Sequence, residues 1–141
     1  MCANLYTADL NAMPEEMLGF TSGKARSGFD FTSEVISVNK LVIGATKGVA
    51  FPTERPEGWQ RAPEASKSKE AIIGEFTASI EAVLKALREA PAERLEEIVE
   101  TPLGAMPVAR LAAIVPGHLM YHSGQLNYIQ TLHGDDEFHW S

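Results

Sequence analysis

Two histidines in the last quarter of the chain are the residues whose type and spacing are best suited to chemistry. His118 and His122 are four positions apart, and Gln125 follows three positions later. Residues 107–133 are predicted to form a helix, because apolar residues recur at helical steps: Leu111, Val115, Leu126, Ile129 and Leu132. Residues four apart lie one above the other on a helix, so the two imidazoles share one face. Such a pair can supply two ligands to a first-row transition metal.

The same pair can also be interpreted as part of the core. A buried imidazole needs a partner for each ring nitrogen, because an unpaired polar group in an apolar environment is costly. His118 and His122 could therefore be core histidines that hydrogen-bond to neighbouring helices. The HxxxH pattern is short and common, so the spacing alone leaves both interpretations open.

Composition limits the classes of protein to consider. The chain has 141 residues, and residues 1–141 are predicted to form a single domain with its own core. The net charge of −7 argues against a nucleic-acid partner. The only cysteine, Cys2, excludes an internal disulfide. No apolar run is long enough for a membrane span and no signal peptide is evident, so we expect a cytoplasmic protein without a membrane partner.

Two further segments show the helical period clearly. Residues 29–47 carry apolar side chains on one face, and Gly48 marks the expected end of this helix. Residues 66–87 have the clearest period of the chain, with Ser66 as the expected N-cap. Pro116 lies inside the last helix and predicts a kink or a break just before His118.

The remaining segments are shorter or lack a period. Two short apolar-periodic pieces occupy residues 5–13 and 14–20. Glycines, prolines and small polar residues predict loops at residues 21–28 and 49–63. No alternation is strong enough to build a sheet. Three long amphipathic helices and a shorter first one favour an all-α fold, most economically a four-helix bundle.

The last helix, HLMYHSGQLNYIQTLHG, resembles the metal-binding helix of the DinB-like (DinB/YfiT) superfamily, where a HxxxHxxQL-type pattern precedes an apolar stretch and a glycine. The two preceding helices fit the order of that fold. The resemblance implies a four-helix bundle of the DinB/YfiT type, often a homodimer, that holds a divalent metal such as zinc or nickel with three histidines. Some members transfer a small-molecule thiol, such as bacillithiol, mycothiol or glutathione, to an electrophile.

Carried over to this chain, the resemblance makes His118 and His122 the paired metal ligands. The family places its third histidine on the second helix, in a stretch like E-V-x-x-H. Here the sequence EVISVN, which starts at Glu34, puts Val38 or Asn39 at that position. On a helical wheel Asn39 and Glu34 flank the apolar stripe on opposite sides. Asn39 is the expected third ligand, and Glu34 is the alternative that would complete a two-histidine, one-carboxylate set.

Two functions from different classes follow. The first is a metal-dependent S-transferase that binds a small-molecule thiol as thiolate and passes it to an unknown electrophile. The second is a non-catalytic bundle, dimeric or not, that has lost the metal and uses the histidines for packing. The sequence assigns no catalytic residue and no organic cofactor, since it has no Ser-His-Asp order, glycine-rich phosphate loop or cysteine nucleophile.

Overall fold

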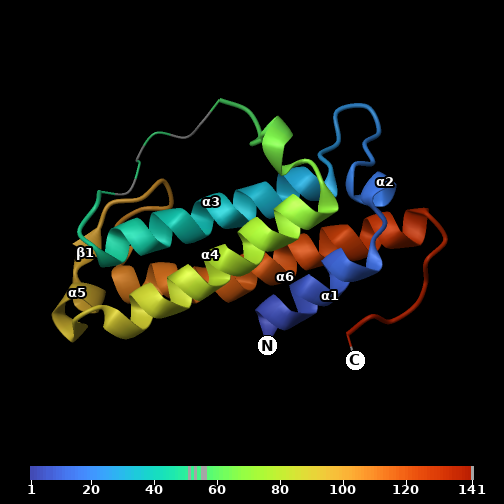
Figure 1. The fold of residues 1–141 in the computed structure, drawn as a ribbon. Helices are drawn as coiled ribbons and strands as arrows, with labels where there is room; N and C mark the ends of the chain where they lie inside the picture. Colours follow the sequence, from blue (N-terminus) through green and yellow to red (C-terminus); the bar gives the residue numbers. More distant parts are fainter. Residues whose placement is uncertain (51, 53, 55–56, 141) are drawn as a thin grey trace.

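The computed structural model describes residues 1–50, 52, 54 and 57–140 (Figure 1). The described elements are, in chain order, the helices α1 (Cys2–Ala12), α2 (Glu15–Leu18) and α3 (Gly28–Thr46), the 3-10 turn η1 (Glu64–Ser66), the helices α4 (Lys69–Glu89) and α5 (Ala92–Glu96), the strands β1 (Ile98–Val99) and β2 (Met106–Pro107), and the helix α6 (Val108–Leu132). Part of the predicted loop at 49–63, namely residues 51, 53, 55 and 56, lies outside the described residues.

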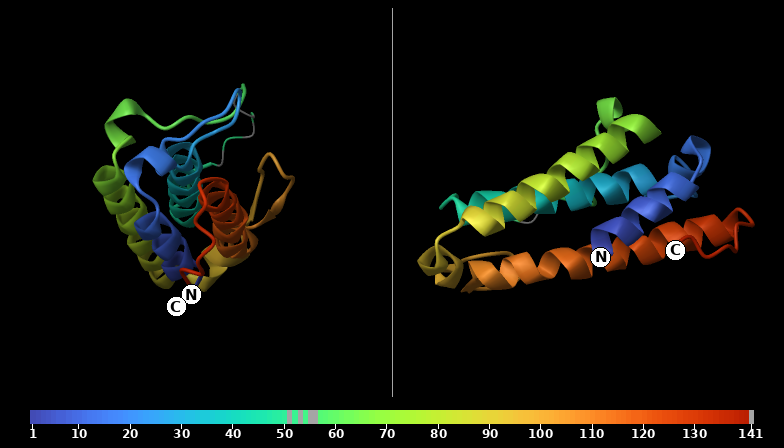
Figure 2. Two further views of the ribbon diagram at one scale, coloured as in Figure 1. Left: turned by 90° about the vertical axis from the view of Figure 1, so that its right-hand side faces the viewer. Right: turned by 60° about the horizontal axis from the view of Figure 1, so that its bottom comes forward.

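The four longest helices pack together as one bundle. α3 packs against α4 and α6, and α1 packs against the same two helices, so that each helix has two neighbours (Figures 1 and 2). Their apolar faces meet in the core, whose most deeply buried side chains include Tyr6, Leu10, Val35, Ile72, Phe76 and Leu126. The predicted all-α bundle is confirmed. Among the described residues, no helix is long and apolar enough to cross a lipid bilayer.

A capping box and a glycine explain where helix α3 begins and ends. Ser27 and Asp30 form a reciprocal capping box, in which each side chain accepts a hydrogen bond from the other residue's backbone N–H. The helix ends before Gly48, whose φ of 84° lies in the left-handed region that favours glycine. Both ends lie within one residue of the predicted helix 29–47.

The start of α4 corrects one prediction. Ser68, and not Ser66, is the N-cap, since its side chain accepts a hydrogen bond from the backbone N–H of Ala71. Ser66 instead lies in the preceding 3-10 turn, where its hydroxyl donates to the carboxylate of Glu75. Both serines precede the same apolar pattern, and only the path of the chain decides which one caps the helix.

Helix α6 is continuous through Pro116, so the predicted break before His118 does not occur. Proline removes one backbone hydrogen bond from a helix interior, but here Pro116 is exposed and its neighbours can remain helical. The helix ends before Gly134, which has a φ of 83°. His118 and His122 therefore lie on one uninterrupted helix.

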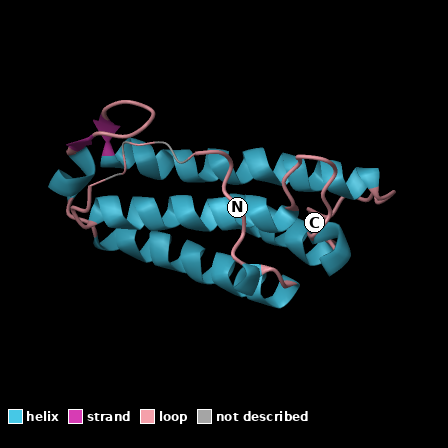
Figure 3. Ribbon diagram, turned by 90° about the horizontal axis from the view of Figure 1, so that it is seen from above, coloured by secondary structure: helices cyan, strands magenta, loops and turns pink. Residues whose placement is uncertain are grey.

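Before α6 the chain forms a short hairpin that the sequence did not predict. The two-residue strands β1 and β2 pair antiparallel, with Val99 opposite Met106 (Figure 3). The connecting loop is held by the Thr101 hydroxyl, which donates to the Gly104 carbonyl and accepts from the Leu103 backbone N–H. Strands of two residues are too short to show an alternating pattern.

Candidate metal centre

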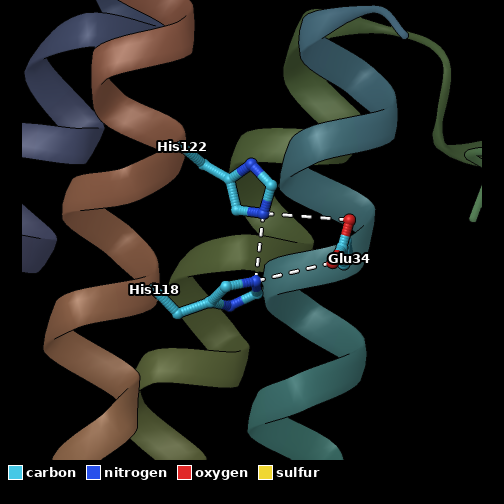
Figure 4. A group of neighbouring side chains, drawn as sticks. All are labelled: Glu34, His118 and His122. Carbon is cyan, nitrogen blue, oxygen red and sulfur yellow. Dashed lines mark hydrogen bonds and ion pairs between the residues drawn. The ribbon is translucent and has the colours of Figure 1, made fainter. Parts of the chain in front are cut away.

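The two histidines of α6 point at a carboxylate of α3 (Figure 4). The Nε2 atoms of His118 and His122 are 3.0 Å apart. The Oε1 atom of Glu34 lies 3.6 Å from His118 Nε2, and its Oε2 atom lies 3.8 Å from His122 Nε2. One donor atom from each of the three residues thus falls within 4.8 Å of the other two.

Asn39 is not part of this group. Its side chain is buried against α4, where its amide Nδ2 donates to the hydroxyl of Ser79 at 3.0 Å. Glu34 and Asn39 are five positions apart, which is about 140° around a helix of 3.6 residues per turn. The residue that faces His118 and His122 is Glu34, the alternative third ligand. The expectation that Asn39 provides the third donor does not fit this arrangement.

Gln125 holds the ring of His122. Its Oε1 atom lies 2.6 Å from His122 Nδ1. An amide oxygen only accepts hydrogen bonds, so Nδ1 carries the proton and Nε2 is left with a free lone pair. His122 is fully buried, which leaves its ring little freedom to turn. A partner of this kind on the second nitrogen is typical of metal-binding histidines.

Arg26 was not recognised from the sequence, because it lies in the loop predicted at 21–28. Its guanidinium is hydrogen-bonded to Glu34 Oε2 and is buried. The ring of Phe31 lies 5.0 Å from the guanidinium carbon and that of Trp59 lies 4.5 Å from it. Gln60, next to Trp59, donates to two serine hydroxyls of α3 and so fixes this segment along the helix.

The charges around the site favour an ionised carboxylate beside neutral imidazoles. Burial acts to raise the pKa of Glu34, but the hydrogen bond and charge of Arg26 outweigh it and hold that pKa below its ordinary value. Burial lowers the pKa of His118, against the opposing charge of Glu34. Burial also lowers the pKa of His122, to about 4. At neutral pH the group therefore offers unprotonated nitrogens and a negative oxygen to a cation.

The sequence pattern of the DinB superfamily matches residues 34–126 of the chain. The matched segment starts at Glu34, ends at Leu126, and includes both histidines and Gln125. It covers well over half of the chain. The chain belongs to the DinB superfamily. No curated protein matches it.

The donor atoms of this DinB superfamily chain fit a divalent metal. In a tetrahedral zinc site with bonds of about 2.05 Å, two ligand atoms are separated by about 3.3 Å. The two nitrogens are 3.0 Å apart, and they lie 3.6 and 3.8 Å from the carboxylate, His118 Nε2 from Oε1 and His122 Nε2 from Oε2 of Glu34. These separations are of the same order as that value. Two imidazoles and a carboxylate are also a suitable donor set for such ions. The carboxylate of Glu34 is thus the third possible donor that the structure brings to His118 and His122.

Two cavities lie near the centre. The larger, about 560 Å³, is lined by the cations Lys24 and Arg26 and by aromatic rings that include Trp59 and Tyr121. The smaller, about 340 Å³, reaches Glu34 and His118 from the side of the hairpin and is lined mostly by aliphatic side chains. A molecule in the smaller cavity would lie next to Glu34 and His118, whereas the larger cavity reaches only Arg26 and Gln125, which contact Glu34 and His122.

Proposed function

We propose that Glu34, His118 and His122 bind a divalent metal, zinc or nickel, and that the protein uses this site as a thiol-dependent S-transferase. The observation that carries the proposal is the convergence of two imidazole nitrogens and one carboxylate oxygen from α3 and α6 within 4.8 Å. Three protein ligands leave a further coordination position for a small molecule, as in catalytic zinc sites. Membership of the DinB superfamily supports the same conclusion.

The residues of the chain have separable roles in this proposal. A divalent ion at this position would supply one thing, a lower pKa for a thiol that binds to it. Gln125 keeps the lone pair of His122 Nε2 directed at the site. Arg26 holds one oxygen of Glu34 and so limits the orientations of the carboxylate. The thiol comes from a small molecule, because Cys2 lies in α1, which does not contribute to the site.

A metal-free role is the alternative function, and one observation favours it. The Nε2 atoms of His118 and His122 lie at hydrogen-bond distance from each other, so the pair satisfies itself without an ion. In that case the histidines, Gln125 and Glu34 form a buried polar network that specifies how α3 packs on α6. Homodimer formation, a cytoplasmic location and the lack of a nucleic-acid partner stay predictions.

Metal content separates the two functions. The full chain, purified without a histidine tag, is analysed by plasma mass spectrometry after incubation with zinc or nickel and removal of unbound ions. We expect about one ion per chain for the wild type and a loss of metal in Glu34→Gln and His122→Ala. Asn39→Ala is the matched control on α3, and it should retain the ion. If the wild-type protein binds no metal, the metal-free structural role is the function that remains.

Transferase activity needs its own measurement. The metal-loaded protein is incubated with glutathione, bacillithiol or mycothiol and with an electrophile, and the thioether product is followed by mass spectrometry. The reaction forms a carbon–sulfur bond as the leaving group departs and the thiol proton passes to solvent. Glu34→Gln should abolish the enzymatic rate. If the wild type carries the metal but forms no thioether with any thiol, the metal site stands and the transferase does not.

A further inference from the structure

The smaller cavity places aliphatic side chains against one end of the metal centre. α3 and α6 run in opposite directions, so the interface beyond Glu34 and His118 is lined by later residues of α3 and earlier residues of α6 (Figure 1). We call this cavity the apolar chamber. Its aliphatic lining consists of Val38, Leu41, Val42, Leu103, Leu111 and Ile114.

Two of the three polar side chains that line the apolar chamber lie at the end next to the metal centre. Glu34 and His118 line that end and belong to the metal centre. Thr101 also lines the chamber, but its hydroxyl is already engaged with Gly104 and Leu103 within its own loop. An aliphatic cavity with converging polar groups at one end suits a ligand that has an apolar body and one polar or reactive end.

The larger cavity has cations and aromatic rings that the apolar chamber lacks. Lys24 and Arg26 line it together with the exposed ring of Trp59 and other aromatic rings, so it suits an anionic molecule that also has an apolar part. The metal centre therefore lies near both a cationic, aromatic cavity and an aliphatic one. Two partners of different polarity could approach the same reactive position from the two cavities.

We propose that the apolar chamber binds the hydrocarbon part of the electrophile, with the reactive carbon at Glu34 and His118. The proposal rests on the proposed function and specifies its substrate class: an alkyl or other apolar compound whose electrophilic carbon is at one end. In the transfer, sulfur bonds to that carbon as the leaving group departs with the bonding electron pair. The thiol approaches from the side of Arg26.

Binding of a homologous series tests this proposal without any turnover. The full-length protein is titrated with 1-butanol, 1-hexanol and 1-octanol, followed by ligand-observed nuclear magnetic resonance, and its metal content is measured in the same samples. Each added methylene should tighten binding about fourfold, which corresponds to about 0.8 kcal/mol, until the chamber is filled. An affinity that does not depend on chain length would overturn the proposal.

Two matched variants of α6 locate the bound alkyl chain of the alkanol. Ile114→Trp adds bulk inside the apolar chamber, and Leu132→Trp adds the same bulk beside the other cavity. We expect Ile114→Trp to weaken 1-octanol binding at least tenfold and Leu132→Trp to leave it unchanged. Equal effects, or a larger effect of Leu132→Trp, would place the ligand elsewhere. If Ile114→Trp does not fold by circular dichroism, Val38→Phe fills the chamber from α3 instead.

The results of these experiments distinguish this proposal from the proposed function. Alkanol binding in a protein that takes up no metal would support the chamber and reject the transferase. Metal and thioether formation without chain-length dependence would support the transferase and reject the chamber as its electrophile site.

Discussion

His122 is the residue on which the polar contacts of the site converge. It is fully buried, its Nδ1 donates to Gln125, and its Nε2 faces both His118 and Glu34. The ring of Phe31 stacks on it at 5.4 Å, which restricts its rotation further. A buried imidazole with one nitrogen held and the other directed at a carboxylate is already arranged for a cation, so little reorganisation is needed when the ion binds.

Replacement of Gln125 tests this arrangement at the scale of one residue. Gln125→Leu keeps the side-chain size but removes the acceptor for His122 Nδ1. We expect the metal affinity to fall about 10- to 100-fold, the usual cost of losing such a partner. The affinity is measured by competition with a chromogenic chelator.

Tyr121→Phe is the control for Gln125→Leu. It removes a hydroxyl that lies 3.5 Å from Gln125 Nε2 and does not touch the Nδ1 contact, so the metal affinity should stay the same. Wild-type affinity in Gln125→Leu would show that burial alone orients His122.

At the scale of elements, the start of α3 is held by a single carboxylate. Asp30 closes the capping box with Ser27 and also accepts hydrogen bonds from the backbone N–H of Ala62 and from Arg61. The side chain is buried, and it connects α3 to the segment that carries Trp59. Because Glu34 lies one turn further along α3, the same contacts also fix where the third candidate ligand stands.

The pH dependence of stability should report the role of Asp30. Burial acts to raise its pKa, but the hydrogen bonds from Ser27, Ala62 and Arg61 hold it below the ordinary value. The unfolded chain therefore takes up the proton first, at about pH 4, and Asp30 stabilises the fold above that pH. This contribution is lost as the pH falls from about 4 through the lower pKa of the folded state.

Asp30→Asn removes this contribution. At pH 7 the free energy of unfolding should decrease by about 1–3 kcal/mol, and the difference from the wild type should shrink below about pH 4. Urea unfolding at several pH values measures both effects. Asp136→Asn, at an exposed position of the tail, should match the wild type at pH 7. A difference that grows on acidification would contradict this role of Asp30.

At the scale of the whole molecule, the C-terminal tail joins the first and last helices through a buried acid. Asp9 of α1 is fully buried and accepts hydrogen bonds from Ser123 and Asn127 of α6 and from the indole N–H of Trp140, the last at 2.7 Å. Both Asp9 and Trp140 lie outside the matched segment 34–126. The tail therefore adds a contact of its Trp140 to the place where α1 meets α6.

Trp140→Phe isolates the contribution of the tail. The aromatic ring remains, but a buried carboxylate loses one charge-assisted donor, so the free energy of unfolding should fall by about 1–3 kcal/mol. Chemical denaturation measures the change. Phe138→Leu is the control. Because Phe138 is 77% exposed, this substitution should change the free energy of unfolding little. If both variants equal the wild type, the tail does not stabilise the bundle.

The sequence by itself determined the helices and the histidine pair. Their periodicity is local, because a residue and its neighbours three or four positions away share a face whatever the helix later packs against. His118, His122 and the following Gln125 were therefore identified together, and so was the all-α bundle. The two-residue strands of the hairpin carried no comparable local signal.

Only the tertiary structure decided which residue of α3 faces that pair. Glu34 and Asn39 flank the same apolar stripe, and the packing of α3 between α4 and α6 turns Asn39 to Ser79 and Glu34 to the histidines. The contacts of Arg26 with Glu34 and of Trp140 with Asp9 likewise join segments that no sequence period connects. Such pairings depend on how whole helices and loops meet, which is why local spacing could not predict them.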